Sequence, residues 1–177
     1  LRVDAGTDWA ALTTAGGNPN ARAYLGFYLL PPGGGEASAF SRLGGTETYL
    51  GFGATGLLEV VFAANAEITD VRFSDFDGER WVAQDLSDAE SNISVTVGGP
   101  TVELALPLEV LSPDPSGEGT TIASGDRVQT RAVYSQGTGG PGTTEDASDL
   151  VIMPASGPAL LVVPDLGLTT EVLEISD

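Results

Sequence analysis

Asp75, Asp77 and Glu79 are the acidic side chains whose spacing best suits ion binding. Ca²⁺ takes about six to eight hard oxygen ligands, and carboxylates are common donors. In an extended strand Asp75 and Asp77 would share one face, because side chains alternate with a period of two. The spacing does not match an EF-hand loop. These three acids are therefore candidate Ca²⁺ ligands, and a solvated turn at Asp77-Gly78 is the alternative interpretation.

The residue types that drive most covalent and acid–base catalysis are missing. The chain of 177 residues contains no lysine, no histidine and no cysteine. A serine nucleophile would therefore lack its usual activating base, and no thiolate or Schiff-base chemistry is available. No glycine run is followed by the Lys-Ser/Thr of a phosphate-binding loop. These absences predict that the protein is not an enzyme, with a close pair of carboxylates as the remaining catalytic alternative.

The charge balance is strongly acidic. The chain has 25 acidic and seven basic residues, all arginines, for a formal net charge of −18. Nucleic acids and anionic membranes attract basic surfaces, so neither is expected as a partner. No run approaches ~18 apolar residues, so no membrane insertion is expected. Such acidity fits a saline exterior or a GC-rich genome. The sequon Asn92-Ile93-Ser94 would matter only in an exported protein.

Short alternating segments separated by glycine and proline dominate the chain. The clearest is a hairpin in which Val95 and Val97 alternate with polar residues, Gly98-Gly99-Pro100 turns the chain, and Val102 and Leu104 resume the alternation. Helical turns are expected only at residues 8–13 and 86–91. About ten short antiparallel strands at this spacing predict an all-β fold, specifically a jelly-roll-like β-sandwich. The other expected strands are 21–30, 46–52, 57–63, 68–76, 79–84, 127–134, 150–153, 159–163 and 170–175.

The whole chain, residues 1–177, is expected to form one domain, because its length and its 41% hydrophobic content can supply a single core. Residues 135–149 are rich in glycine, threonine and acids and are predicted to form a mobile loop. Residues 159–177 are predicted to close the fold as C-terminal strands. The chain begins at Leu1 without a signal-like segment, which indicates a removed segment or a piece of a larger protein.

The tetrapeptide Tyr24-Leu25-Gly26-Phe27 recurs as Tyr49-Leu50-Gly51-Phe52. The repetition does not extend beyond these four residues. We interpret the two copies as core strands with similar packing needs, and not as a duplicated unit.

Several short motifs also follow one another in a characteristic order: Asp8-Trp9, 48–52 (TYLGF), 76–78 (FDG) with Trp81, 102–108 (VELALPL) and 125–134. In this order they resemble the β-sandwich domains of the DOMON and family 9 carbohydrate-binding-module group. The resemblance covers roughly residues 8–134 and implies an exported accessory domain. Some relatives bind sugars between aromatic rings, and others bind haem through a methionine and a histidine. Haem is not expected here, because Met153 has no histidine to accompany it.

Trp9, Trp81 and Tyr134 are the candidate ligand-binding residues. Exposed aromatic rings could stack on a sugar, whereas the alternative interpretation places all three in the core. No cofactor is expected apart from Ca²⁺ at the acidic stretch.

Two functions follow from these observations. The first is a non-catalytic accessory module, extracellular or at the cell surface, with a polysaccharide as its first ligand to test. The alternative is a structural subunit of an extracellular assembly, such as an S-layer, a filament or a viral capsid. In that case the apolar segment 160–175 would pair with the sheet edge of a neighbouring subunit and produce a homo-oligomer.

Overall fold

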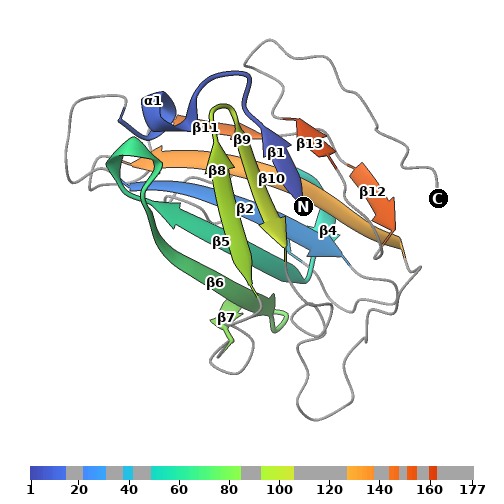
Figure 1. The fold of residues 1–177 in the computed structure, drawn as a ribbon. Coiled ribbons are helices and arrows are strands. Elements are labelled where there is room, and N and C mark those ends of the chain that lie inside the picture. Colours follow the sequence, from blue (N-terminus) through green and yellow to red (C-terminus); the bar gives the residue numbers. More distant parts are fainter. Residues whose placement is uncertain are drawn as a thin grey trace.

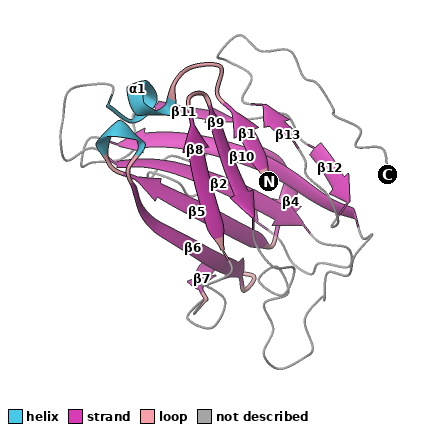
Figure 2. Cartoon of the chain, in the orientation of Figure 1, coloured by secondary structure: helices cyan, strands magenta, loops and turns pink. Residues whose placement is uncertain are grey.

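The structure is a computed structural model. It describes residues 1–14, 22–30, 38–41, 49–84, 93–105, 127–137, 144–147, 151–154 and 160–162. Strands take up most of these residues (Figure 1, Figure 2), and the described helical elements are one short α-helix and one 3₁₀ turn. The all-β prediction is confirmed. None of the described helices has the length and apolar character needed to cross a membrane.

The larger sheet has seven strands and is antiparallel throughout. Its strand order is β11-β10-β2-β5-β6-β7, and β12 also pairs with β10. The central strand β5 is buried along its whole length, as expected of an apolar strand covered on both faces. The bounds are β2 Arg22–Leu30, β5 Gly56–Phe62, β6 Ile68–Phe76, β7 Trp81–Ala83, β10 Arg127–Gly137, β11 Thr144–Ala147 and β12 Val151–Pro154.

The smaller sheet has the order β13-β1-β9-β8 and contains the hairpin that the sequence predicts most clearly. Gly99, the first turn residue, has a φ of +56°, which suits glycine at that position of a type II′ turn. In the described strands, β1 and β13 depart from the antiparallel prediction, because they pair in parallel. The bounds are β1 Arg2–Asp4, β8 Ser94–Gly98, β9 Thr101–Ala105 and β13 Leu160–Val162.

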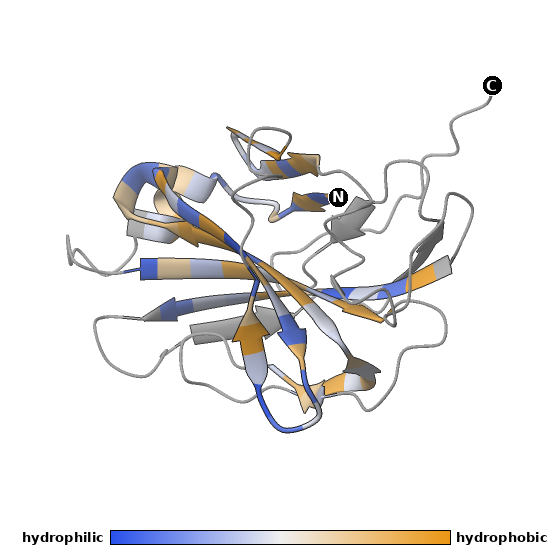
Figure 3. Cartoon of the chain, turned by 90° about the horizontal axis from the view of Figure 1, so that it is seen from below, coloured by the Kyte–Doolittle hydropathy of each residue, from blue (hydrophilic) through white to orange (hydrophobic). Residues whose placement is uncertain are grey.

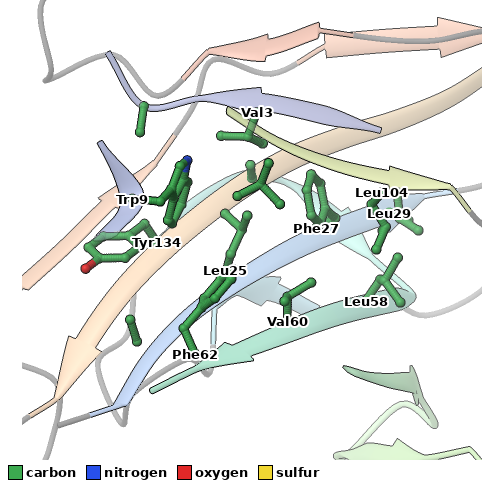
Figure 4. Packing of buried hydrophobic residues seen from close by; sticks show 14 of the residues in the cluster. Val3, Trp9, Leu25, Phe27, Leu29, Leu58, Val60, Phe62, Leu104 and Tyr134 are labelled. Carbon is green, nitrogen blue, oxygen red and sulfur yellow. The ribbon is translucent and has the colours of Figure 1, made fainter. Parts of the chain in front are cut away.

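The smaller sheet lies across one face of the larger sheet (Figure 1), and we call this the inner face. Hydrophobic and hydrophilic residues alternate along several strands (Figure 3), and β2, β5, β6 and β10 of the larger sheet turn apolar side chains inward. The helix α1 (Trp9–Thr14) adds Trp9 to the resulting core. Figure 4 shows this packing, in which Val3 and Leu104 of the smaller sheet meet Leu25, Phe27, Leu29, Leu58, Val60 and Phe62 of the larger sheet. The jelly-roll-like sandwich itself stays a prediction.

The opposite, outer face of the larger sheet carries a second apolar cluster of Tyr28, Leu50, Phe52, Ala54, Leu57 and Val133. The two-stranded sheet of β3 (Ser38–Phe40) and β4 (Tyr49–Ala54) supplies three of these residues. Along β4, Leu50, Phe52 and Ala54 are buried, whereas Tyr49 and Gly51 are exposed. The small sheet therefore rests on the outer face through one side of β4 and turns Tyr49 away from it.

The structure corrects part of the loop predicted at residues 135–149, because 135–137 and 144–147 are strands, and the rest of that range lies outside the described residues. β10 continues to Gly137, and β11 pairs with it from Val133↔Ala147 to Gln136↔Thr144. The sequence of β11, Thr-Glu-Asp-Ala, has little intrinsic strand preference, but ladder hydrogen bonds to a long neighbouring strand override such preferences. The 3₁₀ turn η2 (Ala64–Ala66) is not predicted by the sequence. The predicted helix 86–91 and the C-terminal residues 163–177 lie outside the described residues.

Candidate functional site

Trp9 is a core residue. It is only 1% exposed, and its ring lies 5.5 Å from that of Phe62 and 5.7 Å from that of Tyr134. Its indole N–H donates a hydrogen bond of 2.8 Å to the Pro100 carbonyl. A large ring with its one polar atom satisfied is well suited to burial. Trp9 therefore offers no face to a ligand, and the alternative interpretation of the sequence applies to it.

Tyr134 is also buried on the inner face, with 6% of its surface exposed. Its hydroxyl donates a long hydrogen bond of 3.4 Å to the Leu12 carbonyl. Burial raises the pKa of Tyr134 from 10.0 to about 12, because the phenolate would lose its hydration. Like Trp9, Tyr134 packs in the core and does not form a surface platform.

Trp81 is the candidate aromatic that keeps part of its surface accessible. It lies in β7 at the edge of the larger sheet and packs against the outer-face cluster. Its ring meets Tyr28 edge-on, with ring centroids 5.7 Å apart, and lies tilted against Phe76 at 5.4 Å. These two contacts hold the indole in place, so Trp81 remains a candidate contact at the rim of the outer face.

The acidic stretch forms a hairpin turn. The Asp77 carboxylate accepts hydrogen bonds from the backbone N–H groups of Glu79 (2.9 Å) and Arg80 (2.8 Å). These bonds, first from Arg80 and then from Glu79, lower the pKa of Asp77. In the part of the chain that the structure describes, no group of three or more acids could hold a metal ion. Asp75, Asp77 and Glu79 are therefore not brought together as a Ca²⁺ site, and the solvated turn is the better interpretation.

Phe40 and Tyr49 form an exposed aromatic pair that the sequence reasoning misses. Among the described residues they are the large hydrophobic side chains left exposed, at 51% and 63%. They lie directly opposite each other on β3 and β4, with ring centroids 5.6 Å apart and ring planes at 66°. We call this pair the aromatic corner. The alternation Tyr49-x-Gly51-x-Gly53, with small residues on the side of β4 that carries Tyr49, is the sequence signal that could have found it.

Arg131 fixes the strand that carries the aromatic corner. From β10 its guanidinium donates to the Leu50 carbonyl at 2.9 Å and to the Tyr49 carbonyl at 3.5 Å. Gly51 has a φ of +79°, and a Cβ placed there would lie 3.7 Å from the Arg131 Nη1 atom. The guanidinium and the glycine backbone thus lie close together beside Tyr49.

Among the described residues, Glu59 is the charged side chain that is buried on the outer face. The guanidinium of Arg72 lies near its carboxylate and offsets its negative charge. The Arg72 Nη1 atom lies 3.5 Å from the Glu59 Oε1 atom, and its Nε atom donates to Asp70 at 2.6 Å. The hydrogen bond with Asp70 is the main cause of the raised pKa of Arg72. One guanidinium therefore serves two carboxylates, which we interpret as a structural ion pair that offsets the cost of burying Glu59.

No protein-family model, no curated protein and no solved structure matches this chain. The resemblance to the DOMON and family 9 carbohydrate-binding-module group thus depends on the sequence motifs alone and stays a hypothesis.

Proposed function

We propose that the protein is a non-catalytic, extracellular glycan-binding accessory module that contacts its ligand through the aromatic corner. The observation that carries this proposal is the exposure of Phe40 and Tyr49 by more than half, in contact with each other on one small sheet. The C–H groups on one side of a pyranose ring are weakly positive, and they pack well on the negative face of an aromatic ring. An exposed aromatic pair on a β-strand scaffold is therefore suited to bind sugar rings.

The composition supports a binding role outside the cell. The chain lacks the lysine, histidine and cysteine that most catalytic sites use. Its formal charge of −18 suits a protein that stays soluble and does not adhere to nucleic acid or anionic lipid.

The proposal is tested by affinity electrophoresis of the whole chain through gels that contain different polysaccharides, neutral, acidic and particulate. We expect retardation by at least one polysaccharide, and loss of retardation in Phe40→Ala and Tyr49→Ala. Thr96→Ala, an exposed position on the smaller sheet, is the matched control and should migrate as the wild type does. Absence of retardation by every polysaccharide would contradict the proposal.

A structural subunit of an extracellular assembly is the second candidate, and the edge strand β8 favours it. Among the described strands β8 pairs only with β9, so its other edge has no partner strand there. Its sequence, Ser94–Gly98, contains no charge and no proline, the features by which edge strands usually avoid pairing with other chains. β13, which the sequence hypothesis assigns to a neighbouring subunit, instead pairs with β1 of its own chain over Leu160–Val162.

Light scattering at increasing protein concentration tests this second candidate. Assembly through β8 should be abolished by Thr96→Lys, which places a charge on the edge strand, and retained by Ser38→Lys on the outer-face sheet. A protein that stays monomeric at the highest concentration would exclude it.

A further inference from the structure

We infer that residues 1–14, which contain β1 and α1, form an exchangeable arm that can dock on a second copy of this chain. We call these residues the N-terminal arm, and the strands and side chains that hold it are its docking site. The partner is another molecule of the same protein. This inference depends neither on glycan binding nor on the edge of β8. It is carried by the position of β1, the anchors of α1 and the connection to β2.

β1 lies between two strands of the smaller sheet (Figure 1), which come from much later in the chain. It pairs antiparallel with β9 and parallel with β13, over Arg2–Asp4 in both cases. Just before it, Leu1 and Leu104 exchange two hydrogen bonds of 2.7 Å. If the arm left, the edges of β9 and β13 that it now joins would both lose their ladder partner. Such edges accept an added strand, and the two pairing directions allow it in one orientation.

The side chains of the arm define which segment fits the docking site. Val3 and Trp9 are almost completely buried, at 0% and 1% exposure. The Trp9 indole donates to the Pro100 carbonyl at 2.8 Å, and the Thr13 hydroxyl accepts from the Ala66 N–H at 2.7 Å. An unrelated strand could form the ladder, but it would not supply the buried indole or the hydroxyl. The arm sequence itself is therefore the occupant that the docking site selects.

An arm from a second copy can make all of these contacts, because its sequence is identical. The chain's own arm differs in being joined to β2 through seven residues, 15–21. A short connection gives a segment an effective concentration on the order of millimolar at its own docking site. Exchange therefore competes when the protein itself approaches that concentration. The closed product is a dimer in which each copy holds the arm of the other.

The charge distribution sets the salt dependence of this exchange. Arg2, Asp4 and Asp8 nearly cancel within the arm, so most of the formal charge of −18 lies on the rest of the chain. Two copies that share arms therefore repel each other. Salt screens this repulsion, because the Debye length falls from about 10 Å at 0.1 M to about 3 Å at 1 M. Exchange should accordingly increase with salt.

Two single-cysteine variants, Arg2→Cys and Glu103→Cys, test the inference on the whole chain, which has no cysteine of its own. The two residues lie directly opposite each other on β1 and β9, next to the hydrogen-bonded pair of Leu1 and Leu104. Cα atoms in such a non-hydrogen-bonded pair are about 4.5 Å apart, within the range that a disulfide spans. Both side chains are partly exposed, so the substitutions spare the core.

The two variants are unfolded in urea, mixed and refolded together in a glutathione buffer, and intact mass identifies the mixed disulfide. We expect the mixed disulfide to increase severalfold between about 10 μM and about 1 mM protein, and further from 0.1 M to 1 M salt. Arg2→Cys mixed with Arg80→Cys, at an exposed turn, measures random collision. A yield no greater than in this control at any concentration or salt would overturn the inference.

The double variant with both cysteines in one chain provides the second test. Oxidised at low concentration, it locks its own arm in place and should stay monomeric in light scattering after concentration in 1 M salt. The wild type, refolded at high concentration in that salt, should form dimers. Thr96→Lys should retain these dimers, because its charge blocks pairing through β8 and not arm exchange. A monomeric wild type, dimers of the locked variant, or loss of dimers in Thr96→Lys would each contradict arm exchange.

Discussion

The two faces of the larger sheet are built from the same strands but carry different chemistry. Along β2, Leu25 and Phe27 turn inward to an apolar core, whereas Tyr24 and Tyr28 turn outward. The buried polar residues within the strands of the larger sheet divide in the same way: the inner face holds the hydroxyl of Thr130, and the outer face holds Glu59, Ser74 and Ser135. The inner face is thus specialised for cohesion, and the outer face combines cohesion with polar groups and accessible rings.

The largest expected loss of stability comes from a comparison of the two tryptophans. Trp9→Ala removes a fully buried ring and its hydrogen bond to Pro100, and should cost about 3–5 kcal/mol of the free energy of unfolding. Trp81→Ala, at the half-buried rim of the outer face, should cost roughly half as much. Urea denaturation measures both. Equal losses would contradict the division between the faces.

Alkaline unfolding tests the inner face through Tyr134. Because burial raises its pKa from 10.0 to about 12, the folded state favours the neutral phenol. The contribution of Tyr134 to the free energy of unfolding is on the order of 2 kcal/mol. It is fully present below pH 10, the ordinary pKa of tyrosine, and is lost as the pH rises towards 12. Tyr134→Phe should flatten stability over that interval. If the dependence of stability on pH were the same in the wild type and in Tyr134→Phe, the Tyr134 hydroxyl would not be in a dehydrated environment.

The ion pair on the outer face is expected to have an intermediate effect. Arg72→Ala leaves the Glu59 carboxylate without its described partner and should cost about 1–2 kcal/mol, less than a fully buried pair because half of the Arg72 side chain is exposed. Arg80→Ala is the control, since that pair with Asp77 lies at the surface, and it should leave the free energy of unfolding almost unchanged. Chemical denaturation distinguishes the two.

The smallest stability effect is expected at the aromatic corner. Phe40→Ser should shift the free energy of unfolding by no more than about 0.5 kcal/mol, because exposed rings lose little on truncation. The same variant should abolish glycan retardation. A large loss of stability would place Phe40 among the packing residues and remove it from the proposed site.

The sequence predicts the all-β fold and the β8–β9 hairpin because both depend on local information. Alternation sets which residues share a face, and Gly98-Gly99-Pro100 supplies the turn. Whether a side chain is exposed depends instead on which other elements pack against its strand. The same tetrapeptide, Tyr-Leu-Gly-Phe, occurs in β2 and β4, yet Tyr24 is partly buried whereas Tyr49 is 63% exposed.

The cause of that difference lies in the neighbours of each strand. β2 runs through the centre of the larger sheet between β5 and β10, whereas β4 belongs to a two-stranded sheet that covers the outer face with one side only. For the same reason the sequence suggests Trp9 as a candidate binding residue. Its packing partners, Phe62 and Tyr134, are distant along the chain, so local sequence does not reveal its burial.

The attachments of the first fourteen residues bear on how this protein folds. The Trp9 indole is held by a carbonyl 91 residues later, and the Leu12 carbonyl is held by side chains 122 and 124 residues later. Each of these contacts closes a long loop, and loop closure must precede the stabilisation that it brings. The contacts of α1 with Phe62 and Ala66 can form earlier, but those with Tyr134 and Gln136 require β10. The long-range contacts of α1 are thus among the last to form, and spontaneous refolding should take milliseconds to seconds, as in other all-β proteins.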